Sequence, residues 1–231
     1  MKNKNKAFTL VEIVLAMAII GVVAVLTITN ATKDSDEATK VAQLRSTYNI
    51  LNTALSKAIE ENGPMGGGNN WFGTTSHHKI FDYLKLSKAC FYMTETESDG
   101  CFKEEAQKGN HTTSVDGSSI NSAIRADKAI LSNGASIYIT LGSNYGADVL
   151  VDVNGPNKGN NRYGDDIFGF YIDQNEISPL GMNAPFSTTT DGCPYYGDVC
   201  TAWVIKMGNM EYFKCPEKLS WTEVGKSTCN Q

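Results

Sequence analysis

The feature that most constrains the fold of this chain is an apolar run near its N-terminus, residues 8–28. The run contains no proline and only one ionisable side chain, Glu12. At about 1.5 Å per residue, a helix of this length covers the roughly 30 Å hydrocarbon core of a bilayer. Lysines precede the run and acidic residues follow it, and positive charge usually stays on the cytoplasmic side. We therefore predict a single-pass anchor, with the N-terminus in the cytoplasm and the chain after about residue 30 outside.

The carboxylate of Glu12 is out of place in such a run, where it costs roughly 2–4 kcal/mol on insertion scales. Acids inside membranes usually have a partner. A cut between Ala7 and Phe8 would create an α-amine about one helical turn from Glu12. In parallel helices offset along their axes, the carboxylate of one chain would meet the amine of the next, and the chains would stack helically. The alternative is an ordinary anchor in which Glu12 is protonated or reaches the headgroups.

The segment Lys4-Asn-Lys-Ala7, followed by Phe8-Thr-Leu-Val-Glu12 and the apolar run, resembles the class III signal peptide of type IV pilins and type II secretion pseudopilins. The resemblance implies that a prepilin peptidase removes residues 1–7 and methylates Phe8. It also implies that Glu12 serves in methylation and in subunit docking. The sequence departs from the family at Ala7, where glycine is usual, and it lacks the membrane-segment proline of many pilins.

The resemblance implies a structural subunit of a type IV pilus or a type II secretion pseudopilus. Its partners would be the prepilin peptidase, other pilin or pseudopilin subunits, and an assembly platform in the inner membrane. The subunit would be stored in that membrane with its head outside, and then form a filament in the periplasm or at the cell surface. The alternative is an unprocessed, membrane-anchored binding or adhesin module that still begins at Met1.

Composition argues against two other classes of function. The net charge is −5, and beyond residue 28 there are 17 basic and 24 acidic residues, whereas a nucleic-acid-binding surface should be basic. The chain has no G-x-S-x-G motif, no H-E-x-x-H motif and no phosphate-binding glycine loop. We therefore expect neither nucleic-acid binding nor enzymatic activity.

All six cysteines lie in the part of the chain that we place outside the membrane. An even number of cysteines in an exported domain indicates disulfides, and no C-x-x-C metal motif is present. Sequence alone does not fix the pairing, but local pairing is favoured. The expected pairs are Cys90 with Cys101, Cys193 with Cys200, and Cys215 with Cys229.

Apolar residues continue at helical spacing after the anchor, until Gly63-Pro64 stops the pattern. This predicts one helix from about Thr9 to Asn62; the alternative is two helices hinged near residues 29–32. The chain then divides into a leader (1–7), a transmembrane half-helix (8–28), an outer half-helix (29–62) and a head (63–231). The apolar stripe of the outer half consists of Val41, Leu44, Tyr48, Leu51, Leu55, Ala58 and Ile59.

The head reads as an antiparallel sheet, because its strand-like segments are close together without long helices between them. We predict strands at 135–141, 148–153 and 167–172, with a fourth at 199–206. Short helices are expected at 77–87 and 119–129, with an exposed loop at 94–119 and an exposed His77-His78 pair. The fold class is α+β: a long N-terminal helix packed against an antiparallel sheet, with disulfide-stapled loops.

An oxygen-rich segment lies between the second and third predicted strands, at residues 152–166. Its Asp152, Asn154, Asp165 and Asp166 are hard oxygen ligands of the kind that Ca²⁺ prefers. The segment is not an EF-hand, but it loosely resembles an Asp-rich loop that binds calcium in some major pseudopilins. The alternative is a long turn built from asparagine, glycine and proline for conformational reasons. Apart from this calcium, no cofactor is expected.

Overall fold

The computed structural model describes residues 10–64, 78–93, 100–101, 126–140, 146–187 and 192–230. Among the side chains of residues 10–34, it describes only those of Leu15 and Met17. The chain divides into two compact units, Met1–Thr39 and Lys40–Gln231, and the second contains the head. Among the residues that the structure describes, no helix is both long and apolar enough to cross a membrane. The side chains of the predicted membrane segment lie almost entirely outside the described set.

Helix α1 extends from Leu10 to Asn62, through the residues where the alternative placed a hinge. From Lys40 onward it carries the expected buried stripe, in which Leu44, Leu51 and Ala58 have no exposed surface. Gly63 ends the helix in the left-handed conformation, at φ 78°, and its N–H donates to the carbonyl of Ile59. This is a C-terminal cap that glycine adopts without strain, so the predicted stop is confirmed.

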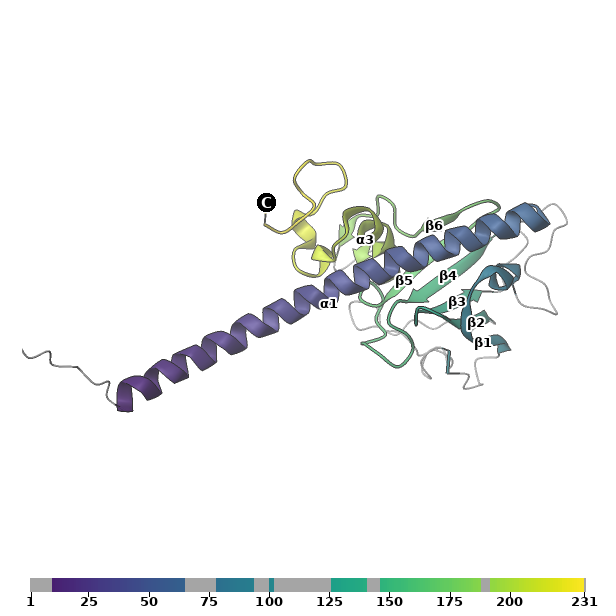
Figure 1. The fold of residues 1–231 in the computed structure, drawn as a ribbon. Coiled ribbons are helices and arrows are strands. Elements are labelled where there is room, and N and C mark those ends of the chain that lie inside the picture. The colour runs from purple at the N-terminus through teal and green to yellow at the C-terminus, as the bar shows by residue number, and fades with distance from the viewer. Residues whose placement is uncertain are drawn as a thin grey trace, which may run out of the picture. The chain divides into compact units, whose positions relative to one another are not determined.

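The head contains a six-stranded sheet in which every neighbouring pair is antiparallel and the strands follow one another in chain order (Figure 1). The predicted antiparallel sheet is therefore confirmed. The strands are β1 (Leu86–Met93), β2 (Ala126–Leu131), β3 (Ser136–Thr140), β4 (Ala147–Asp152), β5 (Ile167–Ile172) and β6 (Ile177–Pro179).

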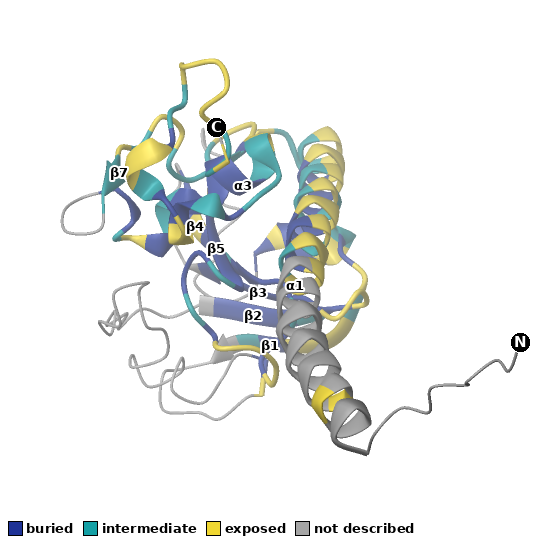
Figure 2. Ribbon diagram, turned by 90° about the vertical axis from the view of Figure 1, so that its left-hand side faces the viewer, coloured by how far each residue is buried: buried dark blue, intermediate teal, exposed yellow. Residues whose placement is uncertain are grey.

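The part of α1 from Lys40 onward packs on one face of this sheet. Tyr48 stacks on Phe170 of β5 with 5.4 Å between ring centroids, and its hydroxyl donates to the carbonyl of Ile177 in β6. Figure 2 shows the buried side of α1 and the central strands in dark blue, with exposed residues on the other side of the helix. The core is therefore the layer between helix and sheet, as the α+β prediction required.

Three local predictions are corrected by the structure. Residues 126–129, expected in a helix, begin β2, because pairing with β1 and β3 overrides the helix propensity of the alanines. Residues 199–206, expected as a strand, form the end of the 3₁₀ turn η2 (Gly197–Cys200) and most of helix α3 (Thr201–Met207). The region 77–87 holds only the 3₁₀ turn η1 (Lys79–Tyr83) before β1 starts. Residues 119–125, and most of the expected loop 94–119, lie outside the described residues.

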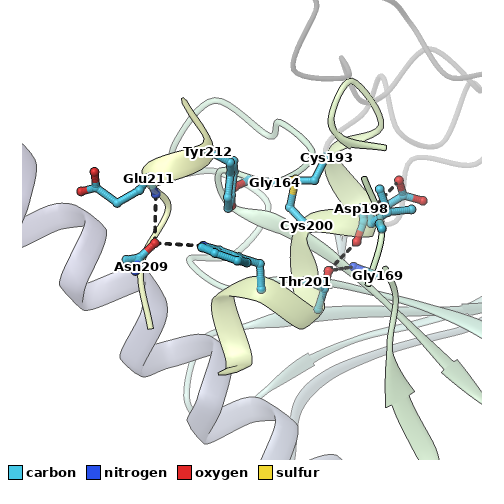
Figure 3. The surroundings of a disulfide bond; sticks show 12 residues. Gly164, Gly169, Cys193, Asp198, Cys200, Thr201, Asn209, Glu211 and Tyr212 are labelled. Atoms are coloured by element: carbon cyan, nitrogen blue, oxygen red, sulfur yellow. Dashed lines mark hydrogen bonds between the residues drawn. A yellow bond between two sulfur atoms is a disulfide. The ribbon is translucent and has the colours of Figure 1, made fainter. Parts of the chain in front are cut away.

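The C-terminal part of the head covers β5 and is built from short elements. These are β7 (Phe186–Ser187), β8 (Cys193–Pro194), η2, α3, η3 (Glu211–Phe213) and η4 (Pro216–Lys218). Thr201 connects this cover to the sheet: its fully buried hydroxyl donates to the carbonyl of Asp198 at 2.6 Å and accepts the N–H of Gly169 in β5 at 2.8 Å (Figure 3). A single hydrogen bond of this kind contributes about 1 kcal/mol to the stability of the folded protein.

Three disulfides are present, and they are the local pairs that the sequence favoured. Cys90 bonds to Cys101, Cys193 to Cys200, and Cys215 to Cys229. The second closes the loop in front of α3, where Figure 3 shows it beside Tyr212. The third joins Cys229 to Cys215, which lies between η3 and η4. Two of the three disulfides therefore hold the loop-rich C-terminal cover in place.

Candidate functional site

The most unusual part of the head is the segment that joins β4 to β5, which we call the acidic loop (residues 152–166). It begins with a turn in which the Oδ1 atom of Asp152 accepts the N–H groups of Asn154 and Gly155, at 3.2 and 3.0 Å. Aspartate commonly forms such turns. Gly155 has φ 87°, and a Cβ there would lie 2.6 Å from the carbonyl oxygen of Gly134. The acidic loop thus packs closely against the turn between β2 and β3.

Asp166 organises the rest of the loop. Its side chain has no exposed surface, and its carboxylate accepts the N–H groups of Asn160, Asn161 and Arg162. A Cβ on Gly159 would lie 2.2 Å from the Oδ2 atom of Asp166, so the backbone can wrap the carboxylate only where glycine stands. The chain is therefore wound around a buried negative charge.

Several buried oxygens at this place have no hydrogen-bond partner. Among the residues that the structure describes, only four buried side-chain oxygen or nitrogen atoms are unsatisfied, and all four are oxygens. Three belong to the acidic loop, and the fourth is on Ser136, which lies directly opposite Asp152 in the β3–β4 register. Leaving such a group unpaired costs about 1–3 kcal/mol. The four atoms are Ser136 Oγ, Asp152 Oδ2, Asn154 Oδ1 and Asn161 Oδ1.

The raised pKa values of two carboxyl groups in the loop also favour a bound cation. Burial, together with the neighbouring carboxylate of Asp166, raises the pKa of Asp152 from 3.8 to about 7. Burial also raises the pKa of Asp166, against the lowering effect of its backbone hydrogen bonds. The nearby charge of Asp165 adds to the raised pKa of Asp166. A cation would stabilise two buried carboxylates whose ionised forms are disfavoured in this way.

The structure divides the predicted calcium ligands into two groups. Asn154 and Asp166 both lie against Gly159, and Asp152 accepts the N–H groups of Asn154 and Gly155 in the turn that starts the loop. Asp165 is engaged elsewhere: its Oδ1 atom forms an ion pair with Lys40 of α1 at 2.6 Å, and its Oδ2 atom accepts the side-chain amide of Asn160 at 3.1 Å.

Sequence reasoning missed Asn161 and Ser136. Asn161 carried one local signal, because asparagine tolerates the left-handed backbone that it adopts here, at φ 47°. Ser136 carried none, since its place beside the loop depends on strand register.

One further cluster has the composition of a metal site. Glu211, Cys215 and Cys229 place their ligand atoms within 4.8 Å of one another. The two sulfurs, however, are bonded to each other. They are therefore not thiolates, and thiolate is the form of cysteine that binds metal.

His78 differs from its expected exposure. It is 1% exposed, and both its ring Nδ1 and its backbone N–H contact the Oδ2 atom of Asp127, at 2.5 and 2.7 Å. The contact ties the start of η1 to β2, and it is structural in character. His77 lies outside the described residues.

The side chains of the predicted processing and assembly residues lie outside the part of the chain that the structure describes. Ala7 and Phe8 lie outside the described residues, and of Glu12 only the helical backbone is described. Their roles stay predictions from sequence.

Comparison with known proteins addresses this N-terminal segment. Residues 2–28 match the family model of the prokaryotic N-terminal methylation motif. The chain therefore carries a prepilin-type cleavage and methylation motif, consistent with the type IV pilin and pseudopilin family. Such a motif implies a membrane-anchored precursor that a prepilin peptidase processes and whose head lies outside the cytoplasm. No curated protein and no solved structure matches the chain.

Proposed function

We propose that this chain is the precursor of a pilin-like structural subunit that assembles into a type IV pilus or a type II secretion pseudopilus. Residues 1–7 are the leader, 8–28 the transmembrane half of the helix, 29–62 its outer half, and 63–231 the head. The observation that carries the proposal is the methylation motif at 2–28. The α+β head that follows, built on the second half of α1, supports it.

In this proposal, cleavage between Ala7 and Phe8 exposes an α-amine at the cytoplasmic end of the apolar run. After extraction from the membrane, the apolar helices pack together in the filament core, which keeps their apolar surface out of water. Glu12 of one subunit pairs with the α-amine of a neighbour, and this pairing sets the axial offset between subunits. No catalytic role is assigned to the head.

The first experiment is the intact mass and N-terminal peptide of the protein purified from membranes. A chain that starts at Phe8 and carries one added methyl group supports the proposal. A chain that starts at Met1, in cells that process other prepilins, contradicts it and favours an unprocessed anchored binding module.

We also propose that the acidic loop binds a hard divalent cation, with Ca²⁺ as the best match to its oxygen donors. The observation that favours this second function is the group of unsatisfied buried oxygens beside two buried carboxylates. The cation would compensate the charges of Asp152 and Asp166 and hold the loop in its wound conformation, which is a structural role.

Thermal unfolding of the full-length chain in detergent tests the cation site. Saturating calcium should raise the melting temperature reversibly, with a chelator restoring the starting value, because a ligand at 100 times its Kd stabilises by about 2.7 kcal/mol. Asp152→Asn should remove most of that rise. A melting temperature that does not respond to calcium or magnesium would exclude the site.

A further inference from the structure

Ser136 is an unexpected residue at the start of β3. It has no exposed surface, and its hydroxyl has no hydrogen-bond partner. A serine hydroxyl rotates freely to find a partner, so a buried one that finds none is uncommon. A bound group from outside the chain, such as an ion, would therefore satisfy this hydroxyl.

The register of the sheet places Ser136 beside the acidic loop. Its Cα is paired with that of Asp152 across β3 and β4, and side chains paired in this way lie on the same face, with Cβ atoms about 4.5–5.5 Å apart. The close approach of Gly155 to Gly134 also brings the loop against the turn that leads into β3. The side chains of Ser136 and Asp152 therefore lie next to each other, yet Ser136 Oγ and Asp152 Oδ2 form no hydrogen bond with each other.

The chemistry of the four unsatisfied atoms distinguishes a cation from a water molecule. Three are acceptor oxygens of side-chain carboxylate or amide groups, and the fourth is a hydroxyl that also has lone pairs. One water has two hydrogens and can donate to only two of them. A hard divalent cation is bound through lone pairs alone, and Ca²⁺ takes about six to eight oxygens.

We propose that Ser136 Oγ is a ligand of the cation in the acidic loop, together with Asp152 Oδ2, Asn154 Oδ1 and Asn161 Oδ1. The inference rests on the cation site proposed above and names its ligands. Asp165 is not one of them, because both its oxygens are engaged by Lys40 and Asn160. Asp166 is a positioning residue: its carboxylate holds three backbone N–H groups and adds negative charge nearby.

A ligand on β3 changes what the cation does. With ligands only from the loop, the ion would order the loop alone. With Ser136 included, the ion bridges the loop to the neighbouring strand, so its binding fixes the loop against the sheet. With only one charged ligand, the site should have an affinity like that of extracellular calcium modules, with Kd of about 10⁻⁴–10⁻³ M.

The test is calcium titration of the full-length chain in detergent, by calorimetry, with Ser136→Ala and the control Ser87→Ala. Ser87 is an exposed serine of β1 that bonds to backbone carbonyls away from the loop. Ser136→Ala should weaken calcium binding by about tenfold or more, as loss of a supporting ligand group does elsewhere. Ser87→Ala and Asp165→Asn should stay within about threefold of the parent chain, as expected of residues outside the ligand set.

A second readout separates a ligand from a structural hydroxyl. Without calcium, Ser136→Ala should melt at the same temperature as the parent or higher, because it removes an unpaired buried hydroxyl. With calcium, it should melt lower than the parent. If the parent chain binds no calcium, the proposed cation site itself fails. If the parent binds but Ser136→Ala binds equally well, or Asp165→Asn loses binding instead, this inference alone is overturned.

Discussion

Asp198 shows how a single carboxyl in the C-terminal cover makes stability depend on pH. Burial raises its pKa above the ordinary 3.8, and the nearby charge of Asp148 adds to the effect. A carboxyl with a raised pKa in the folded state contributes stability at low pH that is lost as the pH rises through the folded pKa. At a pH above the raised pKa of Asp198, its ionised carboxylate therefore lowers the stability of the folded protein.

We expect Asp198→Asn to be more stable than the parent chain at pH 7, and this advantage should shrink as the pH falls towards 3.8. The asparagine oxygen can still accept the N–H of Val199, which Asp198 now accepts at 3.0 Å. Melting temperatures of both proteins between pH 4 and pH 7, without calcium, check this. An advantage of equal size at every pH would contradict the electrostatic explanation.

At the scale of elements, α1 is attached to the head by polar contacts as well as by its apolar stripe. The ion pair between Lys40 and Asp165 joins the helix to the acidic loop, and its side chains are 10% and 20% exposed. Further along, the guanidinium of Arg45 donates to the carbonyl of Ile205 near the end of α3. Cations favour that end of a helix because of its dipole.

Lys40→Met should loosen the first turns of α1 that belong to the head. The pair is partly buried, so its loss should cost about 1–2 kcal/mol, between the values for exposed and buried pairs. Hydrogen exchange should speed up in residues 40–46 while the central strands keep their protection. A double-mutant cycle with Asp165→Asn isolates the pair, and additive effects of the two changes would show that no coupling exists.

At the scale of the whole molecule, the proposed function depends on Glu12 more than on any residue of the head. Glu12→Ala should be processed normally but should reduce filament yield by about tenfold or more, as expected when at least 1.4 kcal/mol per contact is lost. The matched control is Glu60→Ala, which removes an exposed acid from the other end of the same helix. Filament recovery after shearing, with the mature N-terminus verified by mass, is the measurement. Normal yield from Glu12→Ala would remove the pairing with the α-amine from the model of assembly.

Much of the fold could be predicted because it follows from short-range patterns of apolar residues in the sequence. The stripe of α1 repeats every three to four residues, and Leu44, Leu51 and Ala58 are buried as that spacing requires. The alternation of Ile137 and Ile139 likewise marked a strand with one face in the core. Local cysteine pairs needed no knowledge of distant contacts.

Other elements could not be predicted, because distant contacts chose them. Ala126–Leu131 has no strong local preference for a strand, and it becomes one because it pairs with β1 and β3. Residues 201–204 are buried without interruption, and a short apolar run of this kind gives no periodic signal to distinguish a helix from a strand.

The sequence by itself determined the methylation motif, the long helix with its stop at Gly63, the antiparallel character of the sheet and the oxygen-rich composition of the acidic loop. Only the tertiary structure decided which oxygens face one another. It turned Asp165 towards Lys40, and strand register set Ser136 opposite Asp152. The physical reason is that periodicity is a property of neighbouring residues, whereas register and ion pairing join residues that are far apart in the chain.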